Sequence, residues 1–185
     1  MKKYKFTGET KTIYLPFGTV TLHRIKAVVE FGLVKVGDLG GWIEKEENLS
    51  HEENAWVYGD AEVCGNAKVY GNAKVCGNAK VYGDVEVYGN AWVCGNAWVC
   101  GNAKVFSTDH VLVIGAIGSR NDFTTFFRDK DNEITVKCGC FLGKIDKFLE
   151  KVTQTHKDTK HTLAYRTAVE VAKLQIDLTE KSTRR

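Results

Sequence analysis

Eight consecutive copies of a six-residue unit occupy residues 57–104, and this short period restricts the fold more than any other feature. Each copy reads Val, then Tyr or Cys, Gly, Asn or Asp, Ala (once Val) and a variable residue. A Gly followed by Asn or Asp every six residues prevents a helix from propagating, because these residues favour turns. The pieces between the turns are long enough only for short strands. The period therefore predicts a stacked β-solenoid.

The spacing resembles the left-handed β-helix of the hexapeptide-repeat superfamily, in which three hexapeptides form one triangular coil. The resemblance implies about three coils of 18 residues each, at 57–74, 75–92 and 93–110. The last unit, residues 105–110, keeps its aliphatic residue but loses Gly, Asn and Ala. The expected fold is mainly β, with a short left-handed parallel β-helix at its centre.

Strand alternation predicts which side chains face outward. If Val and Ala point into the prism, the residues that flank each Val point out, and these include Trp56, Trp92 and Trp98. Large apolar rings are costly to leave in water, so we predict that these three lie in the interface of a homo-oligomer, most simply a trimer. The Asn and Asp side chains at the corners repeat about every 4.8 Å, which predicts hydrogen-bonded ladders rather than a ligand site.

So short a prism buries little by itself, and its ends are open sheet edges that solenoids protect with caps. We divide the chain into a β-rich N-terminal cap (1–50), the β-helix (51–110), a sheet and helix module (111–178) and a flexible tail (179–185). In the cap, residues 16–18 predict a hairpin turn. The glycine-rich segment 37–43 predicts a tight connection that lets Trp42 cover the first coil.

After the solenoid the period breaks. Three strands are expected, at residues 111–117, 123–128 and 134–141, and they predict an antiparallel sheet. A helical hairpin follows, and its first helix has one apolar stripe made by Ile145, Phe148, Leu149 and Val152. The second helix, over about residues 162–176, offers for burial Leu163, Ala164, Ala168, Val171, Ala172 and Leu174.

The composition indicates the cellular compartment and limits the classes of partner. The first residues contain no apolar run typical of a signal peptide, and no stretch of 18 apolar residues exists. We expect a cytoplasmic protein with no membrane partner, located in the host cytosol if a phage encodes it. The net charge of +3 is spread too evenly along the chain for the usual basic surface that binds nucleic acid, which argues against nucleic acid as a partner.

The six cysteines are expected to be thiols in a reducing compartment. Four of them occupy the position that Tyr fills in other repeats: Cys64, Cys76, Cys94 and Cys100. The other two, Cys138 and Cys140, are expected on one face of a single strand. Two ligands do not make a zinc site, and we expect no metal and no cofactor.

Three segments carry a second resemblance: Gly-Asp-Leu-Gly-Gly-Trp-Ile near the start, the Val-Tyr-Gly-Asn-Ala units, and Ile-Gly-Ser-Arg-Asn with Cys-Gly-Cys-Phe near the end. Together they resemble a group of uncharacterised bacteriophage and prophage proteins over nearly the whole chain. The resemblance implies no established activity. It favours a non-enzymatic binding protein of phage type, with a possible role against host defence.

An enzyme is the first alternative, because many hexapeptide-repeat proteins are trimeric acyltransferases that use a His as general base. The candidate bases here are His51 and His110, at the two ends of the solenoid. The sequence places no carboxylate beside either ring to orient it. We therefore assign no catalytic residue in our main interpretation.

A small anionic or nucleotide-like ligand is the sharpest form of the binding hypothesis. The connector residues Ser119, Arg120 and Asn121, together with Arg128, offer a hydroxyl and two planar guanidinium groups suited to phosphate. Phe126 is a candidate to stack on a base. The alternative for this segment is an ordinary hairpin turn in which Arg120 pairs with a neighbouring carboxylate in solvent. A host protein is a further candidate partner, as is a purely structural trimeric scaffold.

Overall fold

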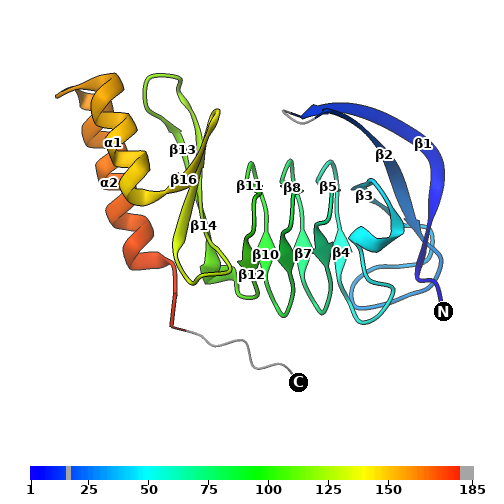
Figure 1. Ribbon diagram of the computed structural model, residues 1–185. Helices are drawn as coiled ribbons and strands as arrows, with labels where there is room; N and C mark the ends of the chain where they lie inside the picture. Colours follow the sequence, from blue (N-terminus) through cyan, green and yellow to red (C-terminus); the bar gives the residue numbers. More distant parts are fainter. Residues whose placement is uncertain (16–17, 180–185) are drawn as a thin grey trace.

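The computed structural model describes residues 1–15 and 18–179. Figure 1 shows three parts in a row: an N-terminal hairpin at the right, a short solenoid in the middle, and a sheet backed by two helices at the left. The fold is mainly β, as predicted. Residues 16–17 of the predicted hairpin turn and residues 180–185 of the predicted tail lie outside the described residues.

Three parallel sheets form the sides of the solenoid. Their strands are β4 (Trp56–Val57), β7 (Lys74–Val75) and β10 (Trp92–Val93); β5 (Glu62–Cys64), β8 (Lys80–Tyr82) and β11 (Trp98–Val99); β6 (Lys68–Val69), β9 (Glu86–Val87) and β12 (Lys104–Val105). Equivalent residues 18 positions apart lie side by side, so that Val57 pairs with Val75 and Val75 with Val93. The predicted parallel β-helix is confirmed.

The interior of the prism is filled by the repeat's Val and Ala side chains, as alternation predicts. All of those from Ala55 to Val105 are at most 1% exposed. At the corners, Asn54, Asn72 and Asn90 form one hydrogen-bonded ladder, with Nδ2 to Oδ1 distances of 2.9 and 3.3 Å. The predicted ladders are therefore confirmed.

The solenoid begins earlier than predicted. Strand β3 (Leu39–Ile43) pairs in parallel with β5, and beyond the 3-10 turn η1 (Glu46–Asn48) Leu49 bridges to Val69. The glycine-rich segment is thus a strand of a further, irregular coil rather than a connection, which raises the solenoid to about four turns and moves its boundary before residue 50. A Cβ on Gly40 would lie 2.6 Å from the Trp56 ring, so glycine allows this close packing.

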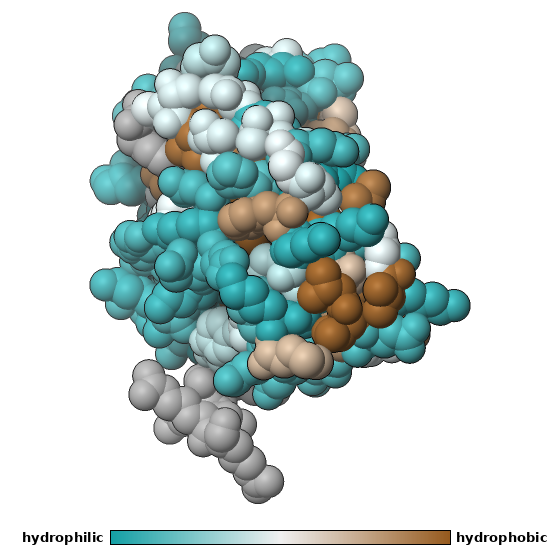
Figure 2. All heavy atoms as spheres, turned by 90° about the vertical axis from the view of Figure 1, so that its right-hand side faces the viewer, coloured by the Kyte–Doolittle hydropathy of each residue, from teal (hydrophilic) through white to brown (hydrophobic). Residues whose placement is uncertain are grey.

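The N-terminal cap continues one solenoid sheet. Strands β1 (Tyr4–Leu15) and β2 (Gly18–Ala27) form the predicted hairpin, and β2 pairs antiparallel with β3. This covers a sheet edge that would otherwise be open. Figure 2 looks at this end of the molecule and shows apolar side chains gathered on it. The exposed apolar residues of the cap include Leu33, Val36 and Leu39.

The C-terminal cap is a sheet of four strands where three were predicted: β13 (Val111–Ile117), β14 (Asp122–Arg128), β15 (Ile134–Cys138) and β16 (Phe141–Lys144). It follows the 3-10 turn η2 (Thr108–His110). The third predicted strand divides because Gly139 adopts a positive φ of 55° and the chain reverses, so that Cys138 pairs with Phe141. Cys138 and Cys140 therefore do not share one strand.

The two faces of this sheet have different neighbours. Phe127 belongs to the core of the solenoid, whereas Phe126 packs with the helices α1 (Ile145–His156) and α2 (Lys160–Gln175). Figure 1 shows the resulting layers of solenoid, sheet and helices. Neither helix is long and apolar enough to cross a membrane.

Both predicted helices are present, but α2 buries only part of its predicted face. Phe148 and Val152 of α1 are buried, as expected. On α2, Leu163 and Leu174 are 67% and 89% exposed, and Val171 is also exposed. The predicted Ala168 and Ala172 are buried, and Tyr165 and Val169 complete the packed face. The prediction of the buried face from the sequence was partly wrong because Tyr165, an aromatic residue with a polar end, was not counted as part of that face.

The prediction that all cysteines are thiols is wrong for one pair. Cys76 and Cys94 occupy the same position on successive coils, with Cα atoms 4.6 Å apart, and the structure joins them in a disulfide. The parallel register is the reason, because it stacks equivalent residues directly over one another. Cys64 and Cys100 are buried thiols.

Two corner glycines test how strongly neighbouring coils restrict each other. Gly89 and Gly95 both have positive φ, of 60° and 70°, but a Cβ on Gly89 would lie 2.7 Å from the Phe106 carbonyl oxygen, whereas Gly95 has open space. Gly95→Ala should cost about 1–2 kcal/mol for the left-handed conformation. Gly89→Ala should cost on the order of 1 kcal/mol more for the clash. Equal losses in urea unfolding would contradict this.

Candidate functional site

The structure separates the predicted ligand-binding residues. Ser119, Arg120 and Asn121 are exposed in the turn between β13 and β14, while Arg128 lies at the opposite end of β14. Phe126 is fully buried and packs edge-on against Phe148, so it cannot stack on a ligand. The predicted anion site with two guanidinium groups and a base platform is therefore not formed by these five residues.

Arg128 contributes to the packing of the C-terminal cap. It is 4% exposed, hydrogen-bonds Asn132 through Nη2, and lies over the ring of Phe106 at 4.5 Å. This guanidinium also lies close enough to His110 to lower its pKa. A buried arginine stacked on an aromatic ring holds β14 against the last coil.

His110 is a packing residue in the same cap. It is fully buried, and its Nδ1 accepts a hydrogen bond of 3.3 Å from the Phe106 backbone N–H. Burial, reinforced by Arg128, lowers the pKa of His110 to about 4. A substrate cannot reach a base with no exposed surface.

His51 lies in the N-terminal cap. Its ring stacks on Tyr4 at 4.2 Å, and its Nδ1 accepts a hydrogen bond from the Lys3 N–H. A carboxylate is present after all, because Glu46 lies 3.8 Å from Nε2. Burial lowers the pKa of His51, and Glu46 acts against this. His51 thus links η1, through Glu46, to the start of the hairpin, through Tyr4. It does not line either of the grooves described below.

The three tryptophans predicted at an oligomer interface have different surroundings. Trp56 is 1% exposed because Tyr4 and Phe31 of the N-terminal cap cover its ring. Trp98 is partly covered by the C-terminal cap. Only Trp92, at 51%, leaves half of its surface to solvent among these three. The argument from solvent exposure therefore applies to Trp92, and the oligomer itself stays a prediction.

A groove of about 300 Å³ lies where the solenoid meets the C-terminal sheet. We call it the Trp98 groove, and its lining includes Asn78, Lys80, Trp98, Phe123, Thr125 and Lys137. The Lys137 Nζ lies 3.9 Å from the centre of the indole ring, and the Lys80 Nζ lies 5.9 Å from it. Two cations and two aromatic rings thus meet in one concave site.

Lys137 places a largely buried side chain in the Trp98 groove, which the exposed Asp122 also lines. Burial lowers the pKa of Lys137, the nearby Cys100 thiol acts against this, and Arg120 adds to the lowering. A Cβ on Gly139 would lie 2.5 Å from the Arg120 Nη1, so this guanidinium lies against the turn that borders the groove. Of the predicted ligand-binding residues, Arg120 alone is brought next to it.

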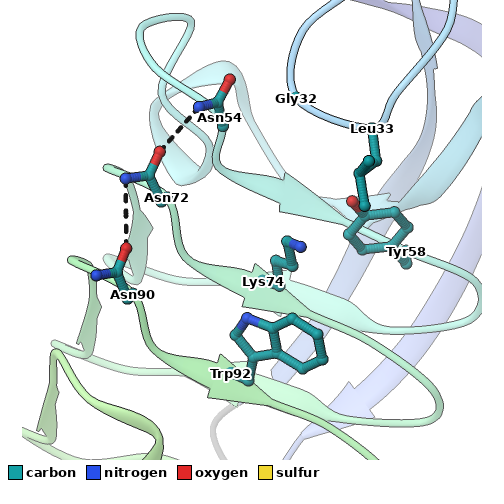
Figure 3. Close-up of a pocket in the computed structure, with 8 residues that line it drawn as sticks. All are labelled: Gly32, Leu33, Asn54, Tyr58, Asn72, Lys74, Asn90 and Trp92. Atoms are coloured by element: carbon teal, nitrogen blue, oxygen red, sulfur yellow. Dashed lines mark hydrogen bonds between the residues drawn. The ribbon is translucent and has the colours of Figure 1, made fainter.

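A second groove, of about 340 Å³, lies on the side of the solenoid formed by β4, β7 and β10. We call it the Trp92 groove. Figure 3 shows the ladder of Asn54, Asn72 and Asn90 along one edge of the groove. Lys74 and Trp92 form the floor, and Tyr58 and Leu33 lie at the end nearest the cap. The Lys74 Nζ lies 4.6 Å from the centre of the Trp92 ring. Every residue that lines this groove is apolar, amide, aromatic or basic.

Sequence reasoning missed Lys80 and Lys137 as site residues. The 18-residue period does place Lys80 beside Trp98, because the two are equivalent residues of successive coils. Lys137 comes from a separate strand, and only the docking of the sheet brings it to the indole ring. No sequence signal specifies that contact.

Comparison with known proteins gives a partial match. No family model matches the chain. A segment of 62 residues, 31% of the chain, is 39% identical to a protein of Escherichia coli strain K12 named uncharacterized acetyltransferase YdcK. The chain spans about a fifth of that protein's length, because the segment covers 19% of it. The match and the solenoid together fit the hexapeptide-repeat β-helix superfamily.

The buried His110 makes a prediction about acid stability. Its folded pKa of about 4 lies below the ordinary value of 6.5, so the unfolded chain takes up a proton first as the pH falls. The free energy of unfolding should drop between pH 6.5 and pH 4 by about 3 kcal/mol. His110→Asn should remove most of this slope in urea unfolding at several pH values. His161→Gln, at the start of α2, is the matched control and should keep the wild-type slope.

Proposed function

We propose that this chain is a non-enzymatic binding protein that holds a small anionic ligand with a planar ring in the Trp98 groove. The observation that carries the proposal is the approach of Lys137 and Lys80 to the indole of Trp98, beside the half-buried ring of Phe123. A planar group can pack against these rings while an anion neutralises the lysines. Sequestration against host defence rests on the phage resemblance alone.

The charge balance of the groove supports an anionic ligand. Lys137 is only 6% exposed, and its Nζ hydrogen-bonds the Gly139 carbonyl, a neutral partner. Lys80 has Glu62 at 3.7 Å. The exposed Asp122 also lines the groove, and its carboxylate accepts a hydrogen bond from the Phe123 N–H. A buried ammonium group whose partner is neutral gains more interaction free energy from a bound anion than an exposed ammonium group does.

The acyltransferase alternative depends on the name of the partial relative and on a histidine base. His110 is fully buried, and His51 packs between the hairpin and η1. Neither lines the Trp98 groove or the Trp92 groove. The alternative predicts release of free thiol when acetyl-coenzyme A is added together with an amine or hydroxyl acceptor. The binding proposal predicts none.

Titration calorimetry with adenosine monophosphate, inorganic phosphate and adenosine tests the proposal. Adenosine monophosphate should bind more tightly than either of its parts, because only it uses both the rings and the lysines. Lys80→Met and Lys137→Met should each weaken binding by about tenfold or more, since a charge-assisted hydrogen bond contributes about 1.5–3 kcal/mol. Binding should also weaken at alkaline pH, as Lys137 with its lowered pKa loses its proton.

Lys68→Met is the matched control, because Lys68 is exposed on another side of the solenoid and should not affect binding. Lys80 is itself half exposed, so its variant tests the site without disturbing the core. Failure of all three probes to bind at millimolar concentration would overturn the proposal. So would equal affinity in the wild type and Lys80→Met.

A further inference from the structure

We propose that the Trp92 groove is a second, independent binding site, and that it takes a pyranose sugar, either neutral or bearing one carboxylate. The site lies on a different side of the solenoid from the Trp98 groove and shares no lining residue with it. A pyranose ring has an apolar face of C–H groups and a rim of hydroxyl groups. The floor and the edge of the groove match these two features.

The floor supplies an aromatic platform. Trp92 is 51% exposed, whereas Trp56 is 1% exposed and Trp98 is partly buried. In Figure 3 its indole lies along the side of the solenoid below Lys74, at the open end of the groove. A rigid indole offers a large contact area with little loss of conformational entropy on binding, which suits the apolar face of a sugar ring.

The edge supplies hydrogen-bonding groups in fixed positions. Asn72 accepts from the Asn54 amide and donates one N–H to Asn90. A side-chain amide has two N–H donors and two acceptor lone pairs, so each of these groups keeps a donor and an acceptor for a ligand. Asn72 and Asn90 are exposed, and the ladder holds their orientation. Ordering them on binding therefore costs little entropy.

The charge of the groove restricts which sugars it can bind. Lys74 is its only charged side chain, and no carboxylate is present among the lining residues. A highly charged ligand such as a polyphosphate would find a single ammonium, already shared with the indole at 4.6 Å. A neutral sugar uses Lys74 as a hydroxyl partner, and a uronic acid uses it as an ion-pair partner. The volume of about 340 Å³ is at the small end for ligand sites, which fits one or two rings.

An extended peptide fits this groove less well. The strands that form its floor already pair with one another, β4 with β7 and β7 with β10. The groove lies over the face of this sheet, whereas strand addition, the usual way in which a sheet recruits a peptide, takes place at a sheet edge.

Saturation-transfer NMR and calorimetry with methyl glucoside, methyl galactoside, N-acetylglucosamine and glucuronic acid test the inference. At least one should bind with a Kd on the order of millimolar, as expected for a single shallow subsite. Trp92→Ala should reduce the affinity by at least about tenfold, and Trp92→Phe should retain part of it. Asn90→Ala should weaken every sugar that binds, whereas Lys74→Met should weaken glucuronic acid more than the neutral sugars.

Lys68→Met, on another side of the solenoid, is again the control and should leave sugar binding unchanged. Lys80→Met should also leave it unchanged, which separates this site from the Trp98 groove. The inference is overturned if none of the four sugars binds at a sugar concentration on the order of 10 mM. It is also overturned if the Trp92→Ala variant binds the sugars with the same affinity as the wild type. It is also overturned if sedimentation shows self-association that Trp92→Glu abolishes, because the groove would then be an interface between copies.

Discussion

Successive coils of the solenoid hydrogen-bond to each other in a constant parallel register, and the rest of the structure depends on that register. The backbone N–H of Trp56 donates to the Ala73 carbonyl, and the N–H of Lys74 donates in the same way to that of Ala91. Each residue thus stands directly over its equivalent in the next coil. The same geometry gathers Val and Ala inside, forms the Asn ladders outside and joins Cys76 to Cys94.

A regular solenoid has uniform sides, so distinct sites arise where the repeat meets something else. The N-terminal loop ends the Trp92 groove through Leu33, and the C-terminal sheet forms one wall of the Trp98 groove through Lys137 and Phe123. The caps therefore have two effects. They protect sheet edges that would otherwise pair with other chains, and they convert flat sides into concave sites.

These placements favour binding over catalysis by histidine. The two candidate bases serve the attachment of the caps: His51 connects the hairpin to η1, and His110 packs beneath the last coil next to Arg128. The groups that line the grooves are mainly aromatic rings, side-chain amides and ammonium groups, and the exposed Asp122 adds one carboxylate to the Trp98 groove. Such groups are suited to recognising ligands, and neither candidate histidine lines either groove.

The sequence by itself determined the solenoid, because an exact six-residue period leaves only one way to bury Val and Ala and to place Gly at corners of positive φ. It also indicated the hairpin, the C-terminal sheet and both helices. Only the tertiary structure decided the first irregular coil, the fourth strand and the buried face of α2, since each depends on contacts between distant segments. The same reason explains why Arg128 and Phe126 do not form the ligand site that the sequence predicted. Both are buried because of the way the sheet docks between the last coil and the helices, and no local sequence pattern encodes this docking.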